Sequence, residues 1–235
     1  MRFQDAARDA RAVVYAGIQA DPLVARAGDL LADASHEQRV LARAVMNGET
    51  TDPDAWRVMF PSLFGRAAAT ADGRAGHAAA ATLERSEAIL EASLAVADRG
   101  EQVRSQVRGA LVEAVTARLL SRRVGNEAVR RERRILFDGV PAEIHPYDVT
   151  VERPGAAEAY DCKWGARGIN ADVLYQLDDA RSHAADEEQR LAVALVMFDA
   201  ARSCEVRLER QTAPHGATRL FTLETLDELA AGTAG

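Results

Sequence analysis

The sequence predicts an α/β domain preceded by an all-helical region. Through the first hundred residues, apolar side chains recur at helical spacing, whereas after Gly100 several segments alternate apolar and polar residues with a period of two. The run "RLAVALVMF" at residues 190–198 is almost wholly apolar, which is typical of a strand buried on both faces. We therefore expect two domains, a helical region over residues 1–100 and an α/β domain over residues 101–235.

Capping and helix-breaking residues divide the helical region. An apolar stripe at helical spacing predicts the first helix, and it consists of Phe3, Ala7, Ala10, Val14 and Ile18. Asp21-Pro22 is typical of a cap followed by a first helical turn, so a second helix is expected to begin there. We expect this helix to run as far as Asn47-Gly48, because glycine is a common stop signal.

Capping and helix-breaking residues also divide the remainder of the helical region. Asp52-Pro53 opens a further helix, which Pro61 interrupts. A longer helix is expected from about His77, because leucine and alanine side chains recur on one of its faces. Gly100 marks the break at which we expect this helix to end.

The α/β domain is predicted from segments in which apolar residues recur with either the period of a helix or the period of a strand. In chain order they are a helix near 103–119, strands at 129–137, 147–152 and 159–164, a helix at 170–185, a strand at 190–198, weaker strands at 204–210 and 218–223, and a short helix near 226–231. The predicted core is thus a helix, a three-strand meander, a second helix and a fourth strand.

The composition excludes several classes of protein. With 48% apolar and 28% charged residues, the chain is expected to be globular rather than disordered. No apolar run reaches the roughly 18 residues that span a bilayer, and the first residues do not resemble a signal peptide. Cys162 and Cys204 lack the spacing of a zinc site or a disulfide framework. We expect a cytoplasmic protein without a membrane partner.

The basic residues of the chain are almost all arginine. Of the 29 basic residues only Lys163 is a lysine, and it lies in the segment "YDCKWG", two residues after Asp161. Arginine stays protonated and cannot be poised as a base, whereas a lysine ammonium is compact and its pKa shifts readily. A single lysine can fall at this place by chance, but the difference from arginine gives a chemical reason for keeping it here.

Two aspartates are expected to lie near this lysine. Side chains alternate between the faces of a strand, so Asp161 and Lys163 share a face and Cys162 points away from it. The turn between the strands at 147–152 and 159–164 is short, so the two strands form a hairpin that can bring Asp148 near Asp161.

Such a pair of carboxylates is suited to a divalent cation. Two carboxylates held close repel each other and raise each other's pKa unless a cation relieves the repulsion. Hard oxygen ligands favour Mg²⁺ or Mn²⁺ over zinc. The ammonium of Lys163 can then orient or help deprotonate a water molecule and offset the charge of a phosphate.

These residues and the order of predicted elements resemble the PD-(D/E)xK nuclease superfamily, which has a restriction-endonuclease-like core. In this chain "HPYDVT" supplies Asp148 and "DCK" supplies Asp161 and Lys163. The segment "ALVEAV" offers Glu113 where many members carry a glutamate on the preceding helix, and "LYQLDD" offers Gln176 where some carry a glutamine. The chain departs from the pattern in having Tyr147 between the proline and the aspartate.

The resemblance implies a role for each of these residues. Asp148 and Asp161 would bind a metal ion together with Glu113 and the backbone carbonyl of Cys162. Lys163 would position the attacking water, and Gln176 would support the site. The resemblance covers roughly residues 102–198.

An arginine-rich segment adjoins this predicted site. The net charge of −7 argues against a general nucleic-acid coat protein, but residues 118–134 hold seven arginines against two glutamates. We expect these arginines to contact phosphates, and the candidates are Arg122, Arg123, Arg130, Arg131, Arg133 and Arg134.

Each assignment has a simpler alternative. Asp148 and Asp161 can be solvent-facing residues of an amphipathic sheet, paired with Lys163 at little gain in stability. Glu113 can be a solvated helix residue, Gln176 can belong to an ordinary helix surface, and the arginines can form a solvated face.

The leading hypothesis for function is an Mg²⁺- or Mn²⁺-dependent deoxyribonuclease, most simply an endonuclease, acting in restriction, anti-phage defence or repair. The sequence does not choose between DNA and RNA. Its helical region would recognise the substrate, form a homodimer or dock onto a partner protein. One alternative is a catalytically inactive protein of the same fold that binds nucleic acid or serves as an assembly subunit. Another is a helical regulator whose α/β domain binds a small ligand, although the chain contains no glycine-rich phosphate loop.

Overall fold

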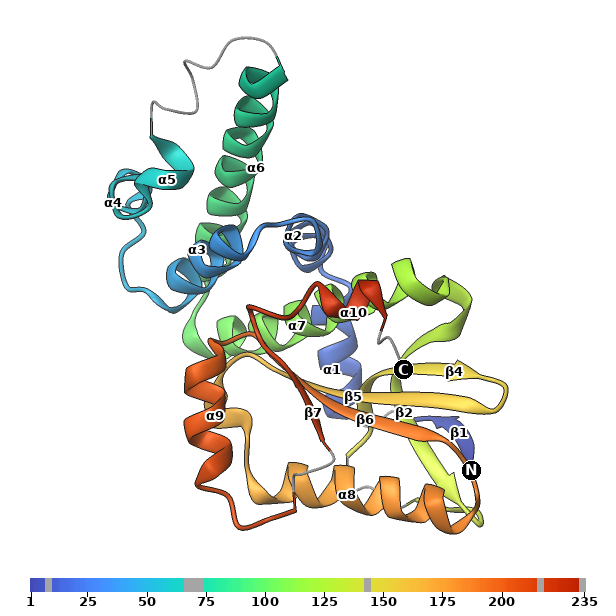
Figure 1. Ribbon diagram of the computed structural model, residues 1–235. Coiled ribbons are helices and arrows are strands. Elements are labelled where there is room, and N and C mark those ends of the chain that lie inside the picture. The colour runs from blue at the N-terminus through green and yellow to red at the C-terminus, as the bar shows by residue number, and fades with distance from the viewer. Residues whose placement is uncertain (7–9, 66–73, 142–144, 215–217, 233–235) are drawn as a thin grey trace. The chain divides into compact units, whose positions relative to one another are not determined.

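A computed structural model describes residues 1–6, 10–65, 74–141, 145–214 and 218–232 (Figure 1). The chain divides into two compact units. One comprises Ala16–Leu111, and the other comprises Met1–Tyr15 together with Val112–Gly235. The sequence placed the division between residues 100 and 101 and assigned the first fifteen residues to the helical region. The two units are described separately below.

In the described residues of the unit Ala16–Leu111, the regular elements are all helices. Its own helices are α2 (Pro22–Ala32), α3 (His36–Asn47), α4 (Pro53–Met59), α5 (Pro61–Phe64) and α6 (Arg74–Ala97). Two more helices, α1 (Ala10–Gln19) and α7 (Glu101–Val124), contribute residues to both units.

The expected helix starts at Asp21-Pro22 and Asp52-Pro53 are confirmed. Asp21 accepts a hydrogen bond from the N–H of Leu23, and Asp52 caps α4 in the same way. The single helix expected from Asp21 to Asn47 is wrong, because the chain forms two helices there. Ser35 and Gln38 form a capping box that starts α3. The side chain of each accepts a hydrogen bond from the backbone N–H of the other, and this arrangement marks the first turn of a new helix.

Helix α6 packs against α2 and α3. The side chains buried between these helices are mainly aliphatic and include Leu31, Leu41, Val45, Ile89 and Leu90. Gln38 is also buried, and its amide donates to Ser86 Oγ at 3.0 Å, so this buried amide is paired.

The described residues of the other unit form one seven-stranded mixed sheet. Its strands are β1 (Arg2–Asp5), β2 (Val129–Phe137), β3 (Val140–Pro141), β4 (Tyr147–Arg153), β5 (Ala156–Lys163), β6 (Leu191–Met197) and β7 (Arg219–Phe221). The order across the sheet is β1-β2-β4-β5-β6-β7, and β3 pairs with β2. Neighbours from β1 to β5 are antiparallel, whereas β5, β6 and β7 are parallel.

The parallel pairs are joined through helices, as a parallel connection requires. Helix α8 (Ala171–Asp186) lies between β5 and β6 in the chain, and α9 (Ala201–Glu209) lies between β6 and β7. Short elements complete the unit: the 3₁₀ turns at Asn126–Ala128 and Ala166–Gly168 and the helix α10 (Glu228–Ala231).

One expected element of this unit is confirmed in part and another is wrong. The helix expected from Phe3 forms from Ala10 onward as α1, whereas residues 2–5 are a strand that pairs antiparallel with β2, and Ala7 of the predicted stripe lies outside the described residues. The all-helical amino-terminal region is therefore interrupted by β1. The strand expected at 204–210 is the helix α9, because Cys204 and Leu208 also lie one helical turn apart and both contact the apolar core.

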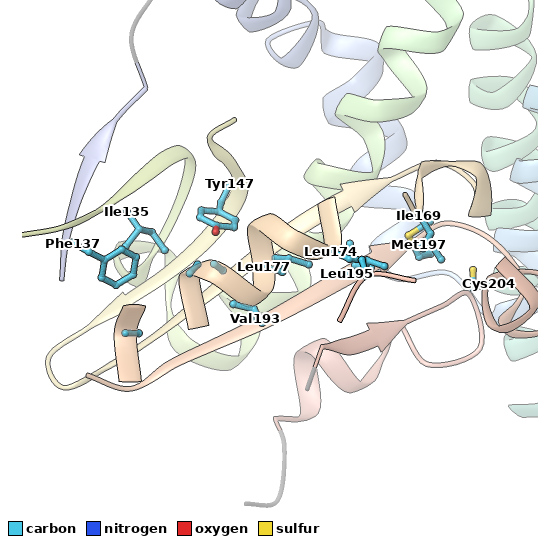
Figure 2. Packing of buried hydrophobic residues seen from close by; sticks show 14 residues of the cluster. Ile135, Phe137, Tyr147, Ile169, Leu174, Leu177, Val193, Leu195, Met197 and Cys204 are labelled. Carbon is cyan, nitrogen blue, oxygen red and sulfur yellow. The ribbon is translucent and has the colours of Figure 1, made fainter. Parts of the chain in front are cut away.

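One face of the sheet is covered by α8 through an apolar core (Figure 2). Leu174, Leu177, Ala180 and Ala184 project from α8 onto Val193, Leu195 and Met197 of β6. Residues 112–124 of α7 contact the opposite face, where Arg123 donates to Glu158 and the Tyr160 hydroxyl. The sheet therefore lies between two helical layers within this unit.

Both cysteines of the chain are free thiols and are buried. Cys162 Sγ lies 3.5 Å from Thr116 Oγ1, and burial raises the pKa of the Cys162 thiol. Within the described ranges, no helix combines the length and the apolar character that crossing a membrane requires.

The cap at Asp21 gives a test of stability in the helical unit. Arg99 Nη1 lies 2.6 Å from Asp21 Oδ2, and this hydrogen bond is the main reason that the pKa of Asp21 is lowered. The folded state favours the ionised carboxylate of Asp21. The ion pair therefore adds to the free energy of unfolding above the ordinary pKa of an aspartate, and this contribution is lost as the pH falls through the lowered pKa of the folded state. We expect Asp21→Ala to lower the free energy of unfolding by about 1 kcal/mol at pH 7.

The measurement uses Trp56, which is buried in this unit, in a Trp164→Phe background so that fluorescence reports one unit. The free energy of unfolding is measured in urea at pH 7, 5 and 3. We expect the difference in this free energy between wild type and Asp21→Ala to become smaller below about pH 4. Asp21→Asn keeps a side-chain oxygen that can accept the capping hydrogen bond but lacks the charge. Its free energy of unfolding at pH 7 should therefore lie between those of wild type and Asp21→Ala. A difference that stays constant with pH would contradict the assigned ion pair.

Candidate active site

Asp148 lies where β4 and β5 separate. The pairing of the two strands extends to Val149 opposite Tyr160, and Asp148 is the next residue of β4. Its Oδ2 accepts a hydrogen bond of 2.6 Å from the backbone N–H of Cys162. The carboxylate thus occupies the position of a missing strand partner, which fixes its place at this end of the hairpin.

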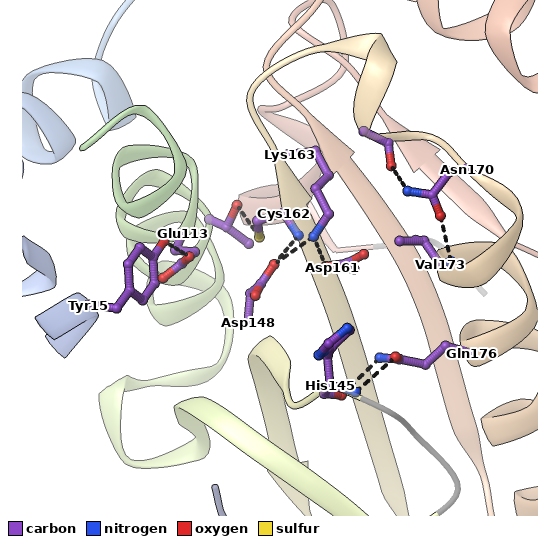
Figure 3. A network of polar contacts seen from close by, with 12 residues as sticks. Tyr15, Glu113, His145, Asp148, Asp161, Cys162, Lys163, Asn170, Val173 and Gln176 are labelled. Atoms are coloured by element: carbon purple, nitrogen blue, oxygen red, sulfur yellow. Dashed lines mark hydrogen bonds and ion pairs between the residues drawn. The ribbon is translucent and has the colours of Figure 1, made fainter. Parts of the chain in front are cut away.

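Lys163 lies between the two predicted aspartates (Figure 3). Its Nζ forms a close ion pair and hydrogen bond with Asp161 Oδ1 and lies 3.5 Å from Asp148 Oδ2. Asp161 is buried, and the Lys163 side chain is 30% exposed. The structure therefore brings Asp148, Asp161 and Lys163 together, as the hairpin argument expects.

The backbone around Lys163 is held on both sides. Its carbonyl accepts a 2.9 Å hydrogen bond from the N–H of Phe198, and the ring of Phe198 stacks on Trp164. A Cβ on Gly168 would lie 2.7 Å from Cβ and Cγ of Lys163. These are the inner atoms of the side chain, which cannot swing aside, so glycine is required at 168 for the lysine to reach the aspartates.

Two glutamates complete the acidic cluster. Glu113 comes from α7 and is 3% exposed, and Glu132 comes from β2. Since Arg131 pairs with Val149 and Arg133 with Tyr147, the register places Glu132 opposite Asp148. Carboxylate oxygens of Glu113, Glu132 and Asp148 lie within 4.8 Å of one another. Glu113 therefore reaches Asp148, as predicted, and Glu132 joins them.

Glu132 has a strained backbone. Its φ of 52° lies in the left-handed region, which a residue with a side chain adopts at a cost of about 1–3 kcal/mol. The strand nevertheless pairs on both sides of it, and its carbonyl accepts a 3.0 Å hydrogen bond from the N–H of Ala6. Pairing with two neighbouring strands thus holds Glu132 in this conformation.

Tyr15 contacts the cluster from α1. Its hydroxyl donates a close hydrogen bond to Glu113 Oε1, as Figure 3 shows. Burial and the neighbouring carboxylate of Glu113 raise the pKa of Tyr15, so the phenol keeps its proton and remains a donor. It therefore holds one oxygen of Glu113 in place.

Several carboxylates lie close together in the cluster. Those of Glu113, Glu132 and Asp148 are neighbours, and the Lys163 ammonium lies beside Asp148 and Asp161. Burial raises the pKa of Asp148, and the carboxylates of Asp161 and Glu113 raise it further against the opposing effect of Lys163. Burial alone would lower the pKa of Lys163, but Asp148 and Asp161 outweigh it and raise that pKa above the ordinary value. A bound cation would relieve this repulsion.

Gln176 does not contact these carboxylates. Its side-chain amide donates to the His145 carbonyl at 3.0 Å, and its Oε1 accepts from the His145 N–H at 3.3 Å. Tyr147 adds a hydrogen bond from its hydroxyl to the Gln176 carbonyl. Gln176 therefore holds the backbone that leads into β4 and supports Asp148 only indirectly.

Cys162 contributes its N–H to Asp148, and the predicted role of its carbonyl as a metal ligand stays a prediction. Arg123 and Arg133, which were predicted to contact phosphates, form ion pairs within the protein. Arg123 pairs with Glu158, and Arg133 pairs with Asp5 and Glu152. Arg122 and Arg130 are exposed, and Arg131 and Arg134 are half-buried. Contact of these arginines with nucleic acid stays a prediction.

Sequence reasoning missed Glu132 and Tyr15. A signal for Glu132 existed, because it is the only acidic residue in the strand "VRRERRILF" and that strand was expected beside the one carrying Asp148. Its register could not be set from the sequence, since the connection between these strands is long. Tyr15 lies 98 residues from Glu113 in the chain, and no local pattern connects the two.

Comparison with known proteins finds no match for this chain among family models, curated proteins or solved structures.

The lone lysine makes the electrostatics of the site directly measurable. Protein labelled biosynthetically with [¹³C]lysine gives one Cε signal, because Lys163 is the only lysine. In metal-free protein we expect this signal to titrate above the ordinary value of 10.5, because Asp148 and Asp161 favour the ammonium form. In Asp148→Asn, which removes one of the two attracting charges, the midpoint should fall.

Circular dichroism at each pH checks that both proteins stay folded through the titration. A wild-type midpoint at or below 10.5, or a midpoint unchanged by Asp148→Asn, would contradict the placement of Lys163 between the two carboxylates.

Proposed function

We propose that this protein is a metal-dependent nuclease that hydrolyses phosphodiester bonds of DNA. The observation that carries the proposal is the position of the Lys163 ammonium between Asp148 and Asp161, beside Glu113 and Glu132. Asp148, Asp161, Lys163 and Glu113 are residues on which the resemblance to PD-(D/E)xK nucleases rests, and Glu132 is an addition to them. The order helix α7, meander β2-β4-β5, helix α8 and strand β6 supports a restriction-endonuclease-like core.

The cluster fits a hard divalent cation. All its donors are carboxylate oxygens, which Mg²⁺ and Mn²⁺ prefer. Oxygens on opposite sides of a bound Mg²⁺ are about 4.2 Å apart. Adjacent oxygens would be about 3 Å apart. The oxygens of Glu113, Glu132 and Asp148 lie within 4.8 Å of one another, so the three side chains would have to close in slightly to hold one ion. Asp161, held beside Asp148 by the shared lysine, offers a further oxygen on the same side.

A bound Mg²⁺ would supply Lewis-acid stabilisation of the charge that develops on the phosphate. Lys163 would act as a hydrogen-bond donor, because its ammonium lies between Asp148 and Asp161. Its N–H groups can orient the attacking water and contact a phosphate oxygen. Tyr15 keeps Glu113 oriented, and Cys162 keeps Asp148 oriented, so the carboxylates are preorganised before substrate binds.

The cleavage test compares Lys163→Met with a matched control. Purified protein is incubated with supercoiled, linear and single-stranded DNA in the presence of Mg²⁺, Mn²⁺ or EDTA. We expect cleavage that requires metal and that falls about 100-fold or more in Lys163→Met, because one preorganised donor to the developing charge is lost. Arg167→Met removes an exposed cation four residues further on and should change the rate little.

If the cleavage rate fell equally in Lys163→Met and Arg167→Met, the loss would be due to removal of positive charge in general and not to Lys163 in particular. DNA binding without cleavage by wild type in any metal would favour a catalytically inactive protein of the same fold. Cleavage that persists in EDTA would contradict the metal dependence.

Metal binding tests the place of Glu132 in the site. Titration calorimetry with Mn²⁺ is expected to show binding that weakens by about 10-fold or more in Glu132→Gln, since one ligand is lost. Glu205→Gln, which removes a carboxylate from α9 that is 55% exposed, is the control and should bind Mn²⁺ as wild type does. Unchanged affinity in Glu132→Gln would exclude Glu132 from the metal site, whatever the result of the cleavage test.

A further inference from the structure

A second concave site lies at the other end of β5 and β6. It is a cavity of about 490 Å³ whose wall includes Ala157, Tyr160, Val193 and Phe221. The pairing of β6 with β7 covers Ala194–Val196, so Leu191–Val193 form an edge in the described part of the sheet. The cavity lies against this edge, and its apolar wall is therefore built on strands.

The cavity is also lined by four arginines from different elements, namely Arg123 of α7, Arg181 of α8, Arg190 before β6 and Arg219 of β7. Glu158 is the one carboxylate among the described lining residues. A cluster of guanidinium groups from four segments around an apolar wall, in a chain whose net charge is −7, indicates an anionic ligand.

The carboxylates around the cavity do not cancel this charge. Arg123 and Arg153 share Glu158, Arg181 pairs with Asp178 at 2.6 Å, and Arg219 pairs with Glu228 at 2.7 Å. The four lining arginines, Arg190 among them, thus outnumber the three carboxylates that pair with lining arginines and with Arg153. Arg219 also lies 4.4 Å above the Phe221 ring, which holds its guanidinium plane against the cavity wall.

Two of these arginines have hydrogen-bonding capacity left. The Nε–H groups of Arg123 and Arg181 are buried and have no hydrogen-bond partner among the described residues. A buried donor without a partner costs about 1–3 kcal/mol. An oxyanion that enters the cavity, together with ordered water, provides acceptors for this set of guanidinium groups.

We propose that this cavity binds a small organic phosphate of about mononucleotide size. Arginine forks match the oxygens of a phosphate, and several of them can share its two charges. The volume lies within the roughly 300–1,000 Å³ of small-molecule sites, and the apolar wall accommodates the body of the ligand.

The cavity is separate from the acidic cluster. On β5 the lining residue nearest to Lys163 is Tyr160, which lies three residues away, about 10 Å along the strand, and points to the opposite face of the sheet. The proposal therefore does not depend on the nuclease hypothesis, and either can fail without the other.

The test is titration calorimetry of the full chain with AMP in metal-free buffer. We expect saturable 1:1 binding that weakens about 10-fold or more in the double variant Arg181→Gln/Arg190→Gln, because charged hydrogen bonds are lost. Arg202→Gln on α9, whose side chain is 80% exposed, is the matched control and should bind as wild type does. Adenosine should not bind, and inorganic phosphate should bind more weakly than AMP.

A second variant distinguishes loss of AMP binding from loss of folding. Ala192→Glu places a carboxylate at an exposed position of the cavity wall, so it should abolish AMP binding and leave the circular dichroism unchanged. Absence of AMP binding to wild type at millimolar concentration would overturn the proposal. So would equal binding of adenosine, binding unaffected by all these cavity substitutions, or tighter binding of citrate, which would make the site a carboxylate site.

Discussion

The contact of the Lys163 ammonium with Asp148 and Asp161 is the interaction on which the candidate site depends. Four carboxylates from α7, β2, β4 and β5 converge here, and burial strengthens their mutual repulsion. The positive charge of Lys163 offsets part of this repulsion. The fold thus tolerates an unfavourable concentration of charge at one place, and such places in proteins are commonly functional.

The surrounding structure can be understood as the means of keeping this cluster in place. The end of the β4–β5 pairing frees the Cys162 N–H for Asp148, and Gln176 clamps the backbone before β4. Gly168 leaves room for the lysine stem, while the hydrogen bond from Phe198 fixes its carbonyl. None of these groups carries out chemistry, yet each determines where a charged atom lies. Side chains that act in catalysis need this kind of rigid support.

Much of the fold could be predicted from the sequence because its signals are local. Alternation over 129–137 and 147–152, the apolar run before Phe198 and the caps at Asp21 and Asp52 each act within a few residues. The errors arose where a local pattern fits two structures. Cys204 and Leu208 fit a strand or a helix, and the need for a connection between the parallel strands β6 and β7 decides for the helix. The strand β1 exists only because β2 is there to pair with it.

The same distinction holds within the site. Asp148, Asp161 and Lys163 could be predicted because a short turn fixes the register of one hairpin. Glu132 depends on a register across a longer connection, and Tyr15 depends on the packing of α1 beside α7, which has no counterpart in the sequence pattern. Sequence therefore determined the part of the site formed by neighbouring strands, whereas tertiary packing added the rest.

The single lysine has a consequence for the chemistry of the whole chain. A reagent or enzyme that acylates lysine side chains has one target, and that target lies inside the acidic cluster. Acylation there would remove the only ammonium between the aspartates and add bulk beside Gly168, where the backbone leaves little room. For this protein, a lysine-directed modification is thus a site-directed one, and a protease specific for lysine would cut the chain directly after β5.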